Sequence, residues 1–265
     1  MRDWKIYERV DPSNKSTYYL YRIHLDRYLT YASLARDLVA LDVGCAYGFG
    51  SRALGREATQ VIGIDTSPEI IKEAMTRYGG RNIDFAVMSA EHLGFREHSI
   101  DGAYAFEVVE HLSKPDLFLD DLEAILTSTG FAILSTPNRL VSTDENPFHI
   151  TEYSWEEFNN SLAKHFSSVQ ILGVSHVPLF ESLIRVRRFL PSNIVELLKG
   201  NRVFEFLIDR IARQGKKSES KSSSGLLAVC SSPWNGVEEN SIRRITRVRA
   251  ESDGQRGTRP LVLVN

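Results

Sequence analysis

Short apolar runs alternate with amphipathic segments along most of the chain. The runs are continuous rather than alternating, which is typical of strands buried on both faces of a sheet. The predicted strands are 38–43, 60–65, 83–88, 100–106, 131–135, 168–174 and 226–231. The predicted helices are 18–33, 51–57, 68–78, 115–126 and 155–166. The alternation predicts an α/β fold with a doubly wound, Rossmann-like, mostly parallel sheet of seven strands.

Two regions depart from this rhythm. Residues 177–216 predict a helical insertion before the last strand, a candidate cap over the acceptor site, and 217–224 form a serine- and lysine-rich linker. We expect 1–37 to form an N-terminal lid helix region, 38–176 the core, 225–233 the last core strand and 234–265 a disordered tail.

Composition narrows the functional classes. The net charge is −2 and the pI about 6.4, which argues against a dedicated nucleic-acid-binding protein. The two cysteines, Cys45 and Cys230, show no paired spacing, so neither a disulfide framework nor a structural zinc site is expected. No leader or membrane-spanning run is visible, and a cytoplasmic location is the expectation. The insertion carries several arginines among large apolar residues, which also suits peripheral contact with the inner membrane face.

A glycine-rich turn follows the first predicted strand. Its glycines, Gly44, Gly48 and Gly50, do not have the G-x-G-x-x-G spacing of dinucleotide sites. The carboxylate of Asp42 precedes them, where it would repel a pyrophosphate but suit an ammonium group. S-adenosylmethionine (SAM) has an ammonium group and no phosphate, so the turn favours this cofactor.

A second carboxylate, Asp65, ends the second predicted strand. An acidic residue about 20 positions beyond the glycine turn can accept hydrogen bonds from both hydroxyls of a ribose. This position suits an adenosine moiety, and alone it does not separate SAM from a dinucleotide.

Four segments, taken in order together with Gly63–Pro68 around Asp65, resemble the class I SAM-dependent methyltransferases, in particular the type 11/type 23 group with its bacterial glycan-associated and ubiquinone-pathway members. Leu41–Gly48 resembles the first motif, with Ala46 in place of a glycine, and Ser89–Phe95 resembles the adenine-edge block, with Ser89 in place of an aspartate. Glu107–Leu112 and Leu134–Asn138 resemble the ends of the fourth and fifth strands. The resemblance implies SAM as cofactor, bound by Asp42, Gly44, Cys45, Ala46, Gly48, Asp65, Thr66, Ser89, Ala90, Glu91 and Phe106.

An upstream segment, His24–Tyr28, resembles a helix signature found before the glycine motif in members linked to surface glycans. In the family this helix tends to cover the cofactor. The resemblance therefore implies that Arg27 and Tyr28 are lid residues.

Two histidines are candidate catalytic bases. His111 follows the fourth predicted strand, and His149 lies in a polar loop. Both are expected at the carboxyl edge of the sheet, where a base within reach of an acceptor hydroxyl would assist methyl transfer.

These histidines also belong to a set that resembles a metal site. Glu107, Glu110, His111 and His149 are similar in type and order to the ligands of small-RNA 3′-terminal 2′-O-methyltransferases, although Leu112 stands where those enzymes have a second histidine. A divalent metal at this set is a hypothesis, because the same string occurs in relatives without a metal role.

The leading interpretation is a SAM-dependent methyltransferase acting on a small molecule or a glycan, most simply on oxygen. One alternative is an RNA 2′-O-methyltransferase with a divalent metal. Another is a non-catalytic protein that binds a partner through the SAM fold. The sequence gives no indication of the acceptor or of the oligomeric state.

Overall fold

A computed structural model describes residues 9–14, 17–141, 146–175, 216–218, 223 and 225–231 of the chain. The expected insertion at 177–216, except for its last residue, and the expected tail at 234–265 lie outside the described residues. Among the described residues no helix has the length and apolar character needed to cross a membrane.

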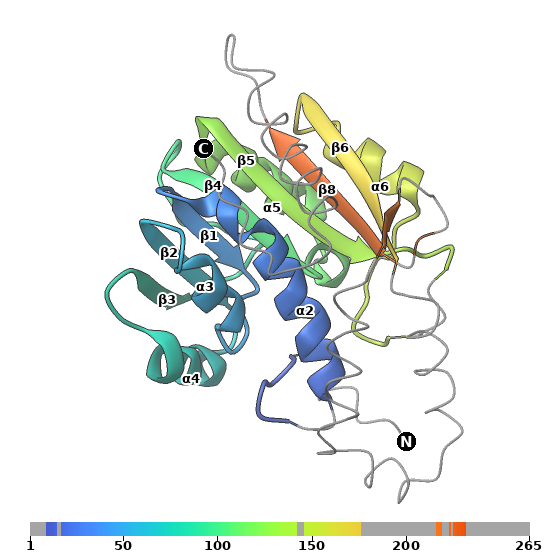
Figure 1. Ribbon diagram of the computed structural model, residues 1–265. Coiled ribbons are helices and arrows are strands. Elements are labelled where there is room, and N and C mark those ends of the chain that lie inside the picture. The colour runs from blue at the N-terminus through green and yellow to red at the C-terminus, as the bar shows by residue number, and fades with distance from the viewer. Residues whose placement is uncertain are drawn as a thin grey trace, which may run out of the picture.

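One central sheet runs through the molecule (Figure 1). Its strands are β1 (Val39–Val43), β2 (Gln60–Asp65), β3 (Ile83–Val87), β4 (Ile100–Phe106), β5 (Leu126–Pro137), β6 (Ser168–Ser175), β7 (Lys216–Ser218) and β8 (Gly225–Ser231). They lie in the order β3-β2-β1-β4-β5-β8-β6-β7. The first five strands pair in parallel, and β8 is antiparallel to both β5 and β6. The seven predicted strands and the mostly parallel doubly wound fold are therefore confirmed.

An eighth strand was not predicted. β7 pairs with the free edge of β6, from Gly173 to Ser175, and includes Lys217 and Ser218 of the expected linker. Unpaired backbone groups at a sheet edge accept any segment that can lie beside them, so this pairing leaves little trace in the sequence. Ser223, farther along the expected linker, is also buried, and its carbonyl accepts a hydrogen bond from Asn138 Nδ2 at 2.8 Å.

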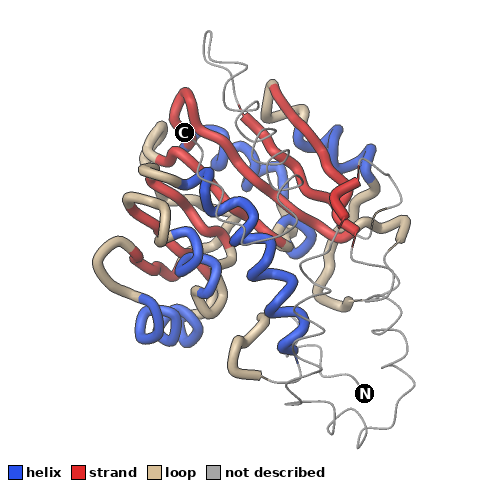
Figure 2. The backbone as a smooth tube through the Cα atoms, in the orientation of Figure 1, coloured by secondary structure: helices blue, strands red, loops and turns tan. Residues whose placement is uncertain are grey.

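Helices cover both faces of the sheet (Figure 2). They are α2 (Tyr18–Tyr31), α3 (Phe49–Leu54), α4 (Pro68–Tyr78), α5 (Pro115–Ile125) and α6 (Trp155–Leu162), with short 3-10 helices η2 (Ala32–Ala35) and η3 (Val109–His111). Ser67 caps α4 by accepting a hydrogen bond from the Ile70 N–H, as its Ser-Pro-Glu start predicts. Ser154 and Glu157 form a capping box at the start of α6.

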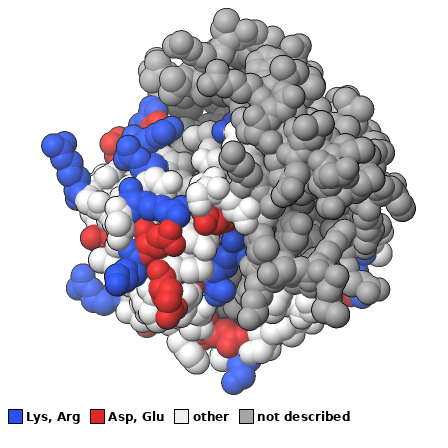
Figure 3. Space-filling model, turned by 90° about the horizontal axis from the view of Figure 1, so that it is seen from below, with Lys and Arg blue, Asp and Glu red and all other residues white. Residues whose placement is uncertain are grey.

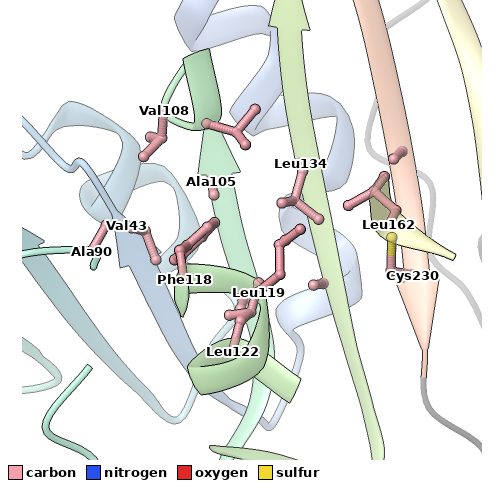
Figure 4. Packing of buried hydrophobic residues seen from close by; sticks show 14 of the residues in the cluster. Val43, Ala90, Ala105, Val108, Phe118, Leu119, Leu122, Leu134, Leu162 and Cys230 are labelled. Atoms are coloured by element: carbon pink, nitrogen blue, oxygen red, sulfur yellow. The ribbon is translucent and has the colours of Figure 1, made fainter. Parts of the chain in front are cut away.

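Alternate residues of the strands face two separate cores. Leu41, Val43, Ala103 and Ala105 pack with α5 and α6, as in Figure 4, which shows part of this core. The intervening residues Ala40, Tyr104 and Phe106 pack on the opposite face with α2, α3 and α4. Both faces of the sheet are thus buried, which explains the continuous apolar runs in the sequence.

The strand order reverses between β1 and β4. The chain leaves β1 toward β2 and β3, and then returns to place β4 on the other side of β1. In doubly wound sheets the crevice at this switch point, beyond the carboxyl ends of the strands, is where ligands bind. The glycine turn after β1 and the Glu107–His111 segment after β4 both lie at this edge.

Candidate functional site

The turn between β1 and α3 has an unusual backbone. Gly44, Ala46 and Gly48 all have positive φ, at 69°, 44° and 80°. A Cβ on Gly44 would lie 2.8 Å from Val108 Cγ2, and one on Gly48 would lie 2.7 Å from Phe85 Cζ. Two of these positions therefore need glycine for space as well as conformation. Ala46, the departure from the resembled motif, adopts the left-handed conformation at a cost of about 1–2 kcal/mol.

Asp42 lies immediately before this turn and is fully buried. Oδ1 accepts a hydrogen bond from the Tyr28 hydroxyl, and Oδ2 accepts one from the Ser51 hydroxyl, both at 2.6 Å. Burial raises the pKa of Asp42 to about 6, although these two hydrogen bonds oppose the rise. The sequence placed this carboxylate against the ammonium of SAM. In the structure its two oxygens accept hydrogen bonds from α2 and α3, which hold both helices against the turn, and its contact with the SAM ammonium stays a prediction.

Asp65 lies at the carboxyl end of β2, beside the same turn. Its side chain is 8% exposed, and Oδ1 accepts a hydrogen bond from the Ser67 N–H at 3.0 Å. The guanidinium of Arg9 lies 3.5 Å from Oδ1 and donates to the Thr66 hydroxyl at 3.4 Å. An arginine that the sequence did not single out thus contacts both Asp65, expected to bind the ribose, and Thr66, expected to contact the cofactor.

The loop after β3 contains Ser89, Ala90 and Glu91. Ser89 Oγ accepts a hydrogen bond from the Glu91 N–H, and Ala90 is buried. Oε1 of Glu91 accepts hydrogen bonds from the Ser113 N–H and hydroxyl and from the Lys114 N–H, at 2.6 to 2.9 Å. These bonds hold the pKa of Glu91 below its usual value. These bonds attach Glu91 to the start of α5, and its contact with the cofactor stays a prediction.

Arg27 joins the lid helix to the ends of β4 and β5. Its Nη1 donates to Glu107 Oε1 and to Ser135 Oγ, each at 2.8 Å, and its guanidinium lies 5.7 Å from the Phe106 ring centroid. Tyr28 makes an edge-to-face contact with Phe106 at 4.8 Å. Both expected lid residues therefore attach α2 to the switch point.

Glu107 follows β4 with a φ of 56°, which is rare for a residue other than glycine. Burial alone would raise the pKa of this carboxyl, but the charges of Arg27 and His24 and the Ser135 hydrogen bond outweigh it and hold the pKa below its usual value. Glu107 is therefore ionised and forms an ion pair with Arg27.

Glu110, His111 and His149 form a compact cluster. One ligand atom of each lies within 4.8 Å of the others, and the two imidazole centroids are 5.0 Å apart. The loop that carries His149 is held on η3, because the Glu110 carbonyl accepts hydrogen bonds from the Ile150 and Thr151 N–H groups. The structure thus brings both predicted catalytic histidines together across 38 positions of sequence.

Each histidine is oriented through Nδ1. That of His111 lies 2.9 Å from the Phe148 carbonyl, and that of His149 lies 2.9 Å from Glu152 Oε1. Because carbonyl and carboxylate oxygens only accept, each Nδ1 carries a proton. Nε2 of His149 lies 2.9 Å from Asn146 Nδ2, which donates to it. Sequence reasoning missed Asn146 and Glu152, although both lie three residues from His149.

Glu110 is fully buried, and among the residues that the structure describes neither of its carboxylate oxygens has a hydrogen-bond partner. Burial, and next the negative charge of Glu107, raise its pKa well above the usual value. A buried carboxylate without a partner is costly, and it is the donor type that a divalent cation would satisfy. The cluster fits a metal through Glu110, His111 and His149. Glu107, the fourth member of the expected set, is bound to Arg27 instead.

Comparison with known proteins supports SAM as the cofactor. Residues 41–134 match the methyltransferase domain family. A Mycobacterium tuberculosis protein named "Probable S-adenosylmethionine-dependent methyltransferase" is 28% identical over 177 residues, which are 64% of this chain and 64% of that protein. The chain therefore matches less than two thirds of this relative's length.

Two further proteins are similar. A ubiquinone biosynthesis O-methyltransferase of Xanthomonas euvesicatoria is 33% identical over 133 residues, covering 49% of this chain and 55% of that one. The protein bound to the Trm112 methyltransferase activator in a complex from Haloferax volcanii has a TM-score of 0.57 at 16% identity, over 83% of this chain and 95% of that one. This last likeness concerns the fold alone. Together with the switch-point geometry, these matches show that residues 41–134 form a class I SAM-dependent methyltransferase domain of the type 11 group.

Proposed function

We propose that the protein transfers the methyl group of SAM to a hydroxyl oxygen of a small molecule or a glycan. The observation that carries this proposal is the His149–Glu152 pair, which lies with His111 at the edge of the sheet where the glycine turn ends. Methyl transfer from a sulfonium needs an aligned acceptor and, for a hydroxyl, a base that removes its proton. Oxygen as the acceptor atom is also supported by the ubiquinone O-methyltransferase relatives.

In this mechanism the His149 imidazole accepts the acceptor's proton at Nε2. Glu152 holds the Nδ1 proton in place and stabilises the imidazolium that forms. Asn146 must release Nε2 as the acceptor binds, because it donates to that atom in the structure. The sulfur–methyl bond breaks as the oxygen–methyl bond forms, and S-adenosylhomocysteine leaves with the electron pair on its sulfur.

As an alternative to base catalysis by His149, we further propose that Glu110, His111 and His149 can hold a divalent cation, which would occupy Nε2 of His149 in place of the acceptor's proton. A bound cation would polarise the acceptor hydroxyl, and Glu110 would lose its proton on binding it. Purified protein should then contain metal, or show a rise in melting temperature with Mn²⁺ or Zn²⁺ that Glu110→Gln abolishes. A protein without metal, unaffected by these ions and equally active in chelator, would remove this part of the proposal.

The transfer itself is tested with radiolabelled SAM against nucleotide sugars, lipid-linked glycans, phenols and RNA. His149→Gln should lower kcat by about 10²–10⁴-fold while SAM affinity stays unchanged. His98→Asn is the matched control, because His98 is exposed and precedes β4, at the opposite edge of the sheet. Full activity of His149→Gln would refute the assigned base.

RNA is the second candidate acceptor, favoured by the carboxylate–histidine cluster. It is disfavoured by the described surface, where acidic and basic side chains lie next to each other on the face in Figure 3. Methylation of RNA but of no small acceptor in the same screen would reverse this order. Failure of the wild-type protein to bind SAM in a calorimetric titration would instead favour a non-catalytic binding role.

Membrane contact through 177–216 is a separate part of the proposal. It rests on sequence alone, because these residues, apart from Lys216, lie outside the described ones. Binding of the full chain to anionic vesicles at low salt would support it, and equal recovery with neutral vesicles would refute it.

A further inference from the structure

The segment at residues 9–14, here called the N-terminal strap, ends on the ribose side of the cofactor site. Arg9 contacts both Asp65 and Thr66, through its 3.5 Å ion pair and its 3.4 Å hydrogen bond. Asp65 is the carboxylate expected to bind the ribose, and Thr66 is expected to contact the cofactor, so this inference rests on the proposed function with SAM as the methyl donor. We propose that Arg9 occupies the position of the ribose hydroxyls and must leave before SAM can bind.

The strap is attached by contacts that do not involve the ribose residues. Asp11 forms an ion pair with Arg77 of α4 at 3.2 Å, and its Oδ1 also accepts from the Ser13 N–H and hydroxyl at 2.8 Å. Val10 is buried, with 6% of its surface exposed. The strap is therefore attached to α4 through Asp11 and packed into the protein at Val10, next to Arg9.

Arg77 connects this attachment to the glycine turn. Its guanidinium lies 5.2 Å from the ring centroid of Tyr47, which is within the turn, and it also pairs with Glu73 one helical turn earlier. One cation therefore links α4, the strap and the loop that would hold the methionine end of SAM.

Arg9 and the ribose of SAM compete for Asp65 because both present hydrogen-bond donors. A ribose presents two O–H donors to a carboxylate, and the Arg9 guanidinium presents N–H donors to the same residue. Oδ1 of Asp65 also accepts from Ser67 N, which limits the capacity left for a second ligand. SAM has a net positive charge, so a guanidinium kept at the mouth of the site would also repel it. Each effect makes Arg9 lower the affinity for SAM.

The decisive measurement is the Kd of SAM by calorimetry for the full chain and its variants. Arg9→Gln should bind SAM about two- to fivefold more tightly than the wild type, the range expected for releasing a partly exposed ion pair. Asp11→Asn, which loosens the strap without touching Asp65, should give a smaller gain in the same direction. The gain of Arg9→Gln should shrink when NaCl rises from about 50 mM to about 0.5 M, because salt screens the Arg9–Asp65 attraction.

Arg56→Gln is the matched control. Arg56 is exposed and lies before β2, at the opposite edge of the sheet, so it removes the same charge far from the ribose side. Its SAM affinity should equal that of the wild type. Unchanged or weaker SAM binding by Arg9→Gln would overturn the inference. Absence of SAM binding by the wild type would instead contradict the proposed function, and Asp65→Ala separates the two, because it should lose binding even where Arg9 has no effect.

Discussion

The Tyr28 hydroxyl donates a 2.6 Å hydrogen bond to Oδ1 of Asp42, joining the lid helix to the residue that opens the glycine turn. Both groups are buried, and the Asp42 carboxylate would lose one of its two hydroxyl donors if the bond were removed. This single contact couples the position of α2 to the backbone that receives the cofactor.

Tyr28→Phe should destabilise the protein by about 1–3 kcal/mol, because it leaves a buried carboxylate oxygen without its donor. It should also weaken SAM binding, since α2 loses a polar attachment to the turn. Urea unfolding and calorimetry measure the two effects. Tyr104→Phe is the control: Tyr104 is also buried, but its hydroxyl donates only a 3.4 Å hydrogen bond to the Tyr31 carbonyl. Equal costs for the two variants would contradict a special role for the Asp42 bond.

The contribution of Asp42 to the free energy of unfolding should fall as the pH rises through the acidic range, opposite to the contributions of Glu91 and Glu107, whose pKa values are lowered. Asp42 has a pKa of about 6 in the folded protein and an ordinary value of 3.8, so between these values the folded state keeps a proton that the unfolded chain has lost. Because of Asp42, the free energy of unfolding falls by up to about 3 kcal/mol across this window. Asp42 does not change it further at higher pH. The raised pKa of Glu110 acts in the same direction above 4.5.

Glu110→Gln should remove the part of this pH dependence that comes from Glu110. In chelator, the difference in unfolding free energy between wild type and variant should move in favour of the variant as the pH rises from about 4 to about 8. Urea unfolding at each pH provides the measurement, with the exposed Glu97→Gln as control. Parallel profiles for wild type and Glu110→Gln would show that Glu110 ionises normally.

Gly50→Ala should displace the lid helix. A Cβ at this position would overlap the Tyr28 ring, and overpacking of this kind costs about 1–3 kcal/mol. Gly94→Ala makes a suitable comparison, because its Cβ would meet only Met88 Cε at 3.7 Å. Thermal unfolding of both variants should show a lower melting temperature for Gly50→Ala alone. A melting temperature of Gly50→Ala equal to that of Gly94→Ala would mean that α2 adapts without cost.

Arg27→Gln should cost about 1–3 kcal/mol, since it leaves the Glu107 carboxylate without its cation at a site where Arg27 is 10% exposed. Arg27→Lys should recover part of this loss, because an ammonium can still pair with Glu107. Arg36→Gln breaks the more exposed Arg36–Glu57 pair and should cost less than about 1 kcal/mol. Chemical denaturation orders the three variants, and a reversed order would show that the Arg27 pair is no stronger than a surface pair.

Much of the fold could be predicted because its signals are local. Gln60–Asp65 and the cap at Ser67 depend on apolar runs and on one turn of chain, and both lie where the sequence places them. β5 is longer than the predicted 131–135, because Leu126 pairs with Ile100 before the register shifts. α6 ends at Leu162 rather than Phe166, although Phe166 is still buried. The ends of these elements depend on contacts with residues that are distant in the sequence rather than on local conformational preference.

The sequence indicates which residues form the candidate site better than it indicates what each residue does there. Asp42 and Glu91 have the expected chemistry, but their partners, Tyr28 and the start of α5, are chosen by the fold. His111 and His149 come together through backbone hydrogen bonds from Ile150 and Thr151 to Glu110, which no spacing in the sequence indicates. Arg9 reaches Asp65 across 56 positions and was missed for the same reason.

The position of β8 has a consequence for how the chain acquires its structure during synthesis. β8 lies between β5 and β6 and is paired with both, although it is the last of the described strands in chain order. Until Ser231 has emerged from the ribosome, β5 and β6 each present an open edge, and β6 has no central strand to join. Non-local pairing of this kind is slow and leaves strand edges open to wrong partners. Chaperone contact and aggregation should therefore be greatest for nascent chains that are arrested before Gly225.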